Sequence, residues 1–115
     1  KSISSSAENR KGKRIYVGKV SLESNNDVKD LALKCIATQK VDVIVLVSNI
    51  GSKTCIVGAT AKNIDMDISK IVSETSNLYG GGASKDPFLS IGGGPGTYSE
   101  DKTIKFIENA LLELI

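Results

Sequence analysis

The sequence contains no histidine and no tryptophan among its 115 residues, and only 4% of them are aromatic. Histidine is the commonest general base and the commonest metal ligand, so its absence removes the usual starting point for acid–base or metal chemistry. A core without aromatics must be built from Ile, Val, Leu and Ala. The length and the 40% hydrophobic fraction are sufficient for one such core. We therefore expect a single aliphatic globular domain.

Cysteine is also scarce, and the two cysteines do not form a C-x-x-C pair. Cys35 falls on the apolar stripe of a predicted helix and Cys55 inside a predicted strand, which indicates two buried free thiols. Their separation predicts neither a disulfide framework nor a zinc site. No signal peptide is evident, and no apolar run reaches the roughly 18 residues of a membrane span. These absences lead us to expect an intracellular, cytoplasmic protein without a membrane partner.

Motifs of enzymes are missing as well. The sequence has no G-x-S-x-G nucleophile elbow, no Walker A pattern and no G-x-G-x-x-G fingerprint directly after a strand. Asp65 and Asp67 precede a predicted helix, where capping explains them better than catalysis does. Nothing assembles into a catalytic constellation, so we expect a non-catalytic binding module that uses no cofactor of its own.

Hydrophobic patterning predicts an α/β protein. Residues 1–13 are rich in Ser, Lys and Asn and are expected to form a flexible basic linker, and the start at Lys1 indicates a C-terminal piece of a longer protein. The pattern predicts strands at 14–22, 41–47 and 54–60, a short strand near 88–91, and helices at 28–36, 68–79 and from the capping box Thr97-x-x-Glu100 to the C-terminus. Asn25, Asn26 and Asp27 are candidate N-caps of the first helix. The expected fold is one layered domain, with a mixed sheet of about four to five strands packed by three helices.

Two glycine clusters, Gly80–Gly82 and Gly92–Gly94, lie close together near the C-terminus. One explanation is structural, a crossing at which two backbones approach closely. The other is a pair of loops whose free N–H groups meet an anion such as a nucleic-acid phosphate, with Lys85 between them. The second cluster leads into the predicted last helix, whose N-terminus favours phosphate, and Tyr98 there is placed to stack on a base. This junction favours the binding interpretation.

Positive charge is concentrated at the N-terminus. Residues 1–20 contain six basic side chains and one acid, whereas the whole chain has a net charge of only +2. Arg10, Lys11, Lys13 and Arg14 could contact phosphates, and the alternative is a solvated segment that precedes the first strand.

The spacing of Gly80–Gly82, Pro87, Leu89 and Gly92–Gly94, followed by a helix, resembles the DHH-associated domain. That domain ends alanyl-tRNA synthetases, where it is called C-Ala, and also ends DHH phosphoesterases. The resemblance covers about residues 14–115, including the upstream order of strands and helices. The chain departs from the family pattern where Asp86 replaces a basic residue before Pro87 and where Ser90 and Ile91 replace Ala-Gln. The phosphoesterases carry a histidine after the glycines, so its absence favours the synthetase branch.

The resemblance implies a subdomain that binds tRNA, tRNA(Ala) at its outer corner, and positions it for aminoacylation and editing. The remainder of the parent synthetase would be its second partner; ATP, with zinc as a second candidate, would belong to that parent. The resemblance carries over only Gly80, Gly81, Gly82, Pro87, Gly92, Gly93 and Gly94. The chemistry of the residues themselves adds Lys85, Tyr98 and the basic run as expected RNA contacts. We expect bulky replacements of Gly93 and Gly94 to abolish RNA binding without unfolding the domain. A free-standing alanyl-tRNA editing hydrolase, the nucleotide-binding domain of a DHH phosphoesterase and a homodimerisation module remain as alternatives.

Overall fold

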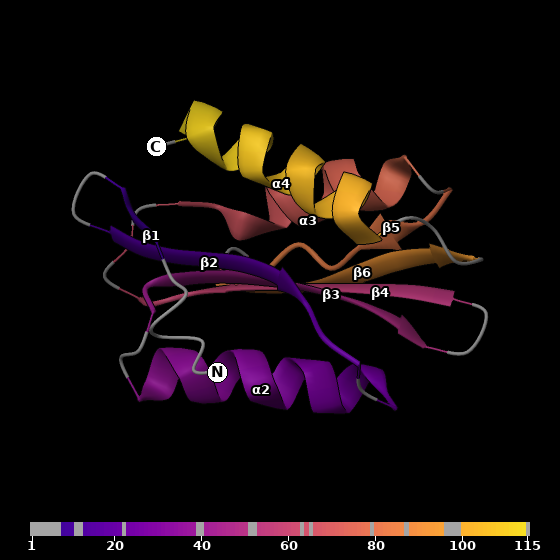
Figure 1. Cartoon of the computed structure of the whole chain (residues 1–115), viewed down its shortest axis with the longest axis horizontal. Coiled ribbons are helices and arrows are strands. Elements are labelled where there is room, and N and C mark those ends of the chain that lie inside the picture. Colours follow the sequence, from indigo (N-terminus) through magenta and orange to yellow (C-terminus); the bar gives the residue numbers. More distant parts are fainter. Residues whose placement is uncertain are drawn as a thin grey trace.

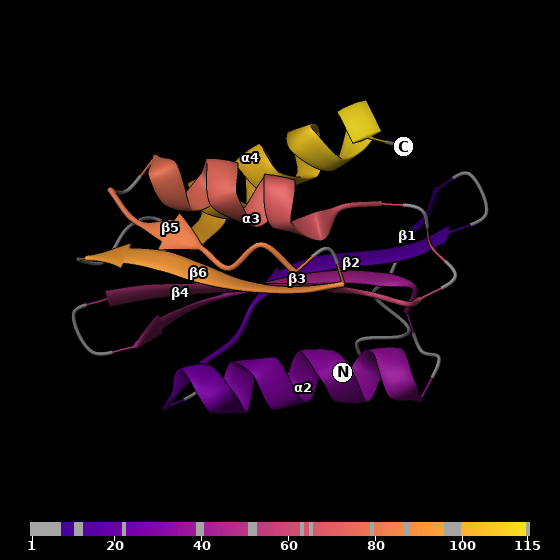
Figure 2. The same cartoon turned by 180° about the vertical axis from the view of Figure 1, so that it is seen from behind.

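A computed structural model describes residues 8–10, 13–21, 23–38, 41–50, 53–62, 64, 66–78, 80–86, 88–95 and 100–114. It shows one sheet between two helical layers (Figures 1 and 2). Helix α2 (Asn25–Ala37) covers one face, and α3 (Ile68–Asn77) and α4 (Glu100–Leu114) cover the other. The predicted α/β class is confirmed, with three helices in the described part of the chain. None of these helices is long and apolar enough to cross a bilayer.

Within the described residues, the sheet has six strands in the order β1-β2-β3-β4-β6-β5. Only β2 and β3 run parallel, as the two ends of a β-α-β unit that contains α2, and every other neighbouring pair is antiparallel. The mixed sheet is therefore confirmed, and its two edge strands are very short. The bounds are β1 Glu8–Arg10, β2 Lys13–Lys19, β3 Val43–Ile50, β4 Lys53–Thr60, β5 Gly82–Ala83 and β6 Leu89–Pro95.

The edge strand β1 lies within the range 1–13, which the composition predicted to be a linker. It pairs antiparallel with β2, with Arg10 opposite Lys13. Its sequence, Glu-Asn-Arg, is wholly polar, and an edge strand can be held by backbone pairing without any hydrophobic alternation. The sheet therefore begins before the position that side-chain patterning indicates.

The central strands form the middle of two aliphatic cores. Residues 43–48 of β3 and 54–60 of β4 are buried throughout, as expected for strands that are covered on both faces. Val43, Val45 and Val47 pack toward α3 and α4, and Ile44 and Leu46 pack toward α2. Cys35 and Cys55 are buried free thiols in the core on the α2 side, as predicted.

Local capping fixes the ends of the helices. Ser24 is the N-cap of α2 and accepts a hydrogen bond from the Asp27 amide at 3.2 Å, so the cap lies one residue before our three candidates. Asp67 caps α3 as predicted, accepting from the Ser69 amide at 3.0 Å. Gly80 ends α3: it has φ +77°, and the Gly81 amide donates to the Ser76 carbonyl, as in a Schellman motif. Leu78, just before it, is 56% exposed.

Candidate nucleic-acid interface

The second glycine cluster lies in a strand, and not in the loop that we predicted. Gly92, Gly93 and Gly94 belong to β6, opposite Ile56, Cys55 and Thr54 of β4. On the other side of β6, Gly93 faces Gly82 and Gly92 faces Ala83 of β5. Glycine disfavours strands on propensity, which is why the sequence indicated a loop. The amides of Gly92 and Gly93 lie between two paired strands, so a free anion-binding nest at these two residues is not the arrangement observed.

Close backbone approach explains the glycines at two positions. A Cβ on Gly81 would overlap the carbonyl oxygen of Gly93, and a Cβ on Gly93 would overlap the carbonyl oxygen of Thr54. Gly93 also has φ +149°, which a residue with a side chain rarely adopts. At Gly81 and Gly93 the glycines are therefore required by close backbone packing, the structural explanation given above. The binding role of the glycines stays a prediction.

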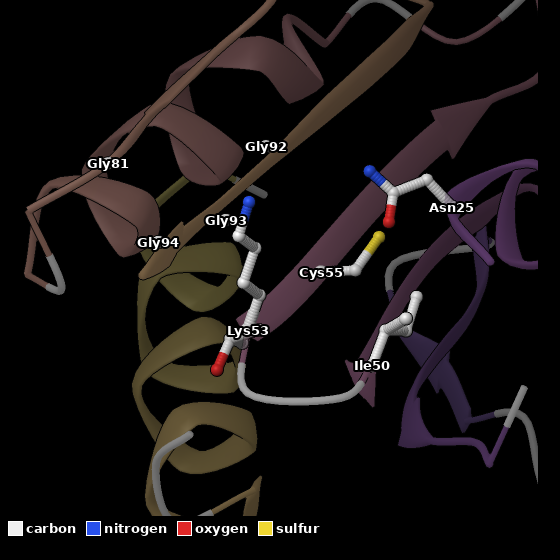
Figure 3. Close-up of a pocket in the computed structure, with 9 residues that line it drawn as sticks. Asn25, Ile50, Lys53, Cys55, Gly81, Gly92, Gly93 and Gly94 are labelled. Carbon is white, nitrogen blue, oxygen red and sulfur yellow. The ribbon is translucent and has the colours of Figure 1, made fainter. Parts of the chain in front are cut away.

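A hollow of about 410 Å³ opens beside this glycine strand (Figure 3). Its wall combines the start of α2, the end of β3, the start of β4 and the glycine strand β6. The residues that line the hollow include Gly92–Gly94, Gly81, Asn25, Ile50, Lys53 and Cys55. The hollow thus gathers both glycine clusters with side chains that lie far from them in the sequence.

Small side chains create the hollow. In the register of the sheet, Ser48 of β3 lies opposite Cys55 of β4, and Cys55 lies opposite Gly93 of β6. The equivalent row two residues along the strands holds Leu46, Val57 and Ile91. Because directly opposed residues point to the same face, Cys55 and Gly93 leave space where Val57 and Ile91 fill the neighbouring row. Ser48 is fully buried and does not line the hollow. Helix α2 packs on β3 and β4, and only its first residue, Asn25, reaches the rim.

The chemistry of the hollow is mixed. Lys53 and Asn25 are exposed and place an ammonium and a carboxamide at the rim, while Ile50 is half-buried. Cys55 is only 2% exposed, and this burial raises the pKa of its thiol from 9.0 to about 11. At neutral pH the floor is therefore an uncharged thiol, and the charge in the hollow comes from Lys53.

Asp86 has a structural role in the segment between β5 and β6. Its carboxylate accepts hydrogen bonds from the amides of Phe88 at 2.9 Å and Leu89 at 3.4 Å. A basic side chain at this position would not supply that acceptor, which gives a physical reason for the departure from the family pattern. Lys85 precedes Asp86 on the same segment and is exposed, as a phosphate contact requires. It does not line the hollow.

The basic run lies at the other end of the sheet. Arg14, the second residue of β2, lies beside Asp42, whose carboxylate accepts from the Arg14 amide at 2.9 Å and lies 3.6 Å from the Arg14 Nε. The hollow is at the opposite end, beside Ile50 and Lys53. Eight residue steps separate Asp42 from Ile50, roughly 26 Å along the strand. The structure therefore does not bring together the glycines and Arg14, which we had combined in one RNA contact.

Several predicted positions lie outside the described residues. Lys11, Pro87 and Tyr98 are among them, as are the side chains of Arg10 and Lys13, so their roles stay predictions. In the part of the chain that the structure describes, no three His, Cys, Asp or Glu side chains gather as a metal site would require.

Sequence reasoning missed five residues of the hollow, namely Asn25, Ile50, Lys53, Thr54 and Cys55. The strands on either side of residues 51–52 and the helix start near residue 25 were predicted, so the local elements were available. No signal in the sequence showed that the start of α2 and the adjoining ends of β3 and β4 would lie beside the glycine strand, because this proximity depends on the pairing of β6 with β4.

No protein-family model matches the chain, and no curated protein matches it in sequence. Among solved structures, the chain is similar to the C-Ala domain from the alanyl-tRNA synthetase of Aquifex aeolicus, with a TM-score of 0.78 and 21% identity. The alignment covers 91% of this chain and 96% of that domain. The chain therefore has the C-Ala fold over nearly its whole length.

Proposed function

We propose that this chain is a tRNA-binding C-Ala domain of an alanyl-tRNA synthetase, which positions tRNA(Ala) for aminoacylation and editing and performs no catalysis itself. The observation that supports it most is the extent of the fold match, 91% of this chain against 96% of a C-Ala domain. The parent enzyme, as a ligase, would join alanine to tRNA with ATP, and a homodimer would form through that parent.

The hollow end of the sheet is the surface we propose for RNA. It combines an exposed ammonium, Lys53, with an exposed carboxamide, Asn25, beside a strand that lacks side chains at Gly92–Gly94. A backbone without side chains lets a phosphate–sugar chain approach closely, and a cation at its edge adds the attraction that dominates nucleic-acid affinity. At the other end, the guanidinium of Arg14 already has a carboxylate, Asp42, beside it. We therefore rank the hollow end above the basic run as the main contact.

Binding of the fragment to folded tRNA at two salt concentrations tests this proposal. We expect affinity that falls with salt, and Lys53→Ala should lower the salt slope by about 1, the change for one lost phosphate contact. Lys70→Ala is the matched control: Lys70 is exposed on α3, which packs on the other face of the sheet, and its loss should leave the slope unchanged. Absence of tRNA binding, or equal effects of both variants, would reject the proposed surface.

A mononucleotide competitor separates this function from that of a phosphoesterase substrate domain. A single nucleotide at a few-fold excess over tRNA should not displace it, because tRNA makes phosphate contacts that a mononucleotide lacks. Ready displacement at that ratio would favour the phosphoesterase alternative. Sedimentation without RNA addresses the dimerisation alternative, since dimers of the isolated chain would be its sign.

A further inference from the structure

The hollow has the size and shape of a ligand site and not only of a surface contact. Its volume of about 410 Å³ lies within the usual range for small-molecule pockets. An RNA backbone that only passed over the surface of the domain would need an open face and no hollow. The hollow instead has Cys55 and the backbone of Gly93 at its base, with Asn25 of α2, Ile50 of β3 and Lys53 of β4 around them (Figure 3).

The lining matches a flat, mostly apolar ring better than a bare anion. The thiol of Cys55 is uncharged and Ile50 is aliphatic, so neither offers anything to a phosphate group. Gly93 and Gly94 have no side chains, so the peptide plane between them presents a flat surface on which a planar ring can lie. Gly92 faces the other side of the sheet, where the side chains of Ser76 and Ala83 lie close to it. The only charged group among the lining residues is Lys53, and it stands at the rim.

Polar groups at the rim match the edge and the phosphate of a nucleotide. The carboxamide of Asn25 offers two N–H donors and one carbonyl acceptor, the combination that can pair with the edge of a base. Lys53 begins β4 at the mouth of the hollow, and in the described part of the chain it has no ion-pair partner. An ammonium so placed can meet the phosphate of the nucleotide whose base is inside.

We propose that the hollow receives a single unstacked nucleobase of an RNA strand, with the base over Gly93 and Cys55, its edge at Asn25 and its phosphate at Lys53. This inference rests on the proposed function, since the RNA strand is the source of the base. It adds one inserted nucleotide to a contact that would otherwise be electrostatic. Single-stranded or loop positions are the RNA parts whose bases can be unstacked in this way.

Amide chemical shifts of the wild-type fragment test the inference directly, with AMP at millimolar concentration as the probe and inorganic phosphate as its control. We expect AMP to shift the amides of Gly93, Gly94 and Cys55, while phosphate alone shifts Lys53 at most. The amide of Gly58, on β4 but beneath α3, should not move in either titration. No AMP shifts at the glycine strand, or the same pattern with phosphate, would overturn the inference.

Filling the hollow gives a second test that uses tRNA. Cys55→Met extends a side chain into the space, while Cys35→Met places the same change in the same core, on α2 and away from the hollow. We expect Cys55→Met to weaken tRNA binding about tenfold, the effect of one lost base-stacking contact, and Cys35→Met to leave it unchanged. Circular dichroism and a melting curve identify variants that fail to fold, and for these the wild-type titration alone decides.

The two proposals can fail separately. If the fragment binds tRNA in a salt-dependent manner, but Cys55→Met binds as wild type and AMP leaves the glycine amides unshifted, the base pocket is wrong and the tRNA function stands. If tRNA does not bind while AMP shifts the glycine amides, the tRNA function is wrong, and with it the inserted RNA base, because the hollow is then a site for free nucleotides.

Discussion

Gly81 lies directly against Gly93: the carbonyl oxygen of Gly93 occupies the place where a Cβ on Gly81 would stand. Gly81 follows the cap of α3, and Gly93 is inside β6, so this contact joins the two glycine clusters. The two clusters are thus parts of one packing contact. The chain that leaves α3 at Gly81 packs so closely against β6 that no side chain fits between them.

Gly81→Ala should therefore destabilise the domain, by about 1–3 kcal/mol, the usual range for overpacking. Gly82→Ala is the matched control, because a Cβ there meets nothing within 4 Å and the backbone is already extended in β5. Removing backbone freedom from the unfolded chain at such a site should be neutral or stabilise by about 0.5 kcal/mol. Urea denaturation measures both, and equal midpoints for the two variants would contradict the close approach.

Gly93→Val should disrupt the edge of the sheet, which corrects our expectation from sequence. A side chain there would overlap the Thr54 carbonyl and require a residue with a side chain at φ +149°. Strain of this kind costs about 1–3 kcal/mol before the clash is counted. Loss of tRNA binding in this variant would thus report partial unfolding, and a melting temperature equal to wild type would show that the strand had adapted.

The elements that the sequence predicted well are those with a local physical signal. Nearly continuous apolar runs identify β3 and β4, periodic apolar residues identify the helices, and Asp67 identifies the start of α3. The elements it missed have no such signal. Wholly polar β1 pairs through its backbone, and the glycines of β6 have no side chains to form a pattern.

The hollow could not be predicted for a different reason. Its side chains come from α2, β3 and β4, and they meet only because β6 pairs with β4 and the β2–α2–β3 unit places Asn25 above that end. The proximity of these side chains depends on the order of strands in the sheet, and local sequence patterns do not determine that order. The sequence drew attention to the glycines, but the loop predicted for the second cluster was wrong, and Lys53 was not predicted.

Asp42 should stabilise the start of β2 mainly through its hydrogen bond to the backbone. Its carboxylate accepts from the Arg14 amide at 2.9 Å, while the ion pair at 3.6 Å involves a half-exposed guanidinium. Exposed ion pairs contribute little, so Asp42→Asn, which keeps an acceptor, should change stability by less than about 0.5 kcal/mol. Asp42→Ala should cost about 1 kcal/mol. If Asn and Ala destabilised equally in urea, the charge and not the hydrogen bond would be the stabilising part.

Asp67→Ala should remove the N-cap of α3 and cost about 1 kcal/mol. The carboxylate accepts from both the amide and the hydroxyl of Ser69, so its loss leaves a helix-start donor unsatisfied. Glu74→Ala, at an exposed position on the same helix, is the control and should be nearly neutral. Because α3 packs on β6, amide exchange at Gly92 should also accelerate in Asp67→Ala. Unchanged exchange there would mean that fraying of α3 does not reach the glycine strand.

The thiol of Cys55 should make the domain less stable at alkaline pH. Burial raises its folded-state pKa to about 11 from 9.0, so the folded state resists ionisation that the unfolded chain undergoes readily. Below pH 9 both states keep the proton and the group contributes its full stability. As pH rises from 9 to 11 the unfolded state releases the proton first, and up to about 2–3 kcal/mol is lost. Urea midpoints of wild type and Cys55→Ala, compared from pH 8 to pH 11, isolate this loss. We expect the alanine variant to be less stable at every pH, but its stability should fall less steeply with pH because it has no thiol to ionise. Parallel curves would show that the thiol ionises in the folded state as easily as in the unfolded one, and that water reaches the floor of the hollow.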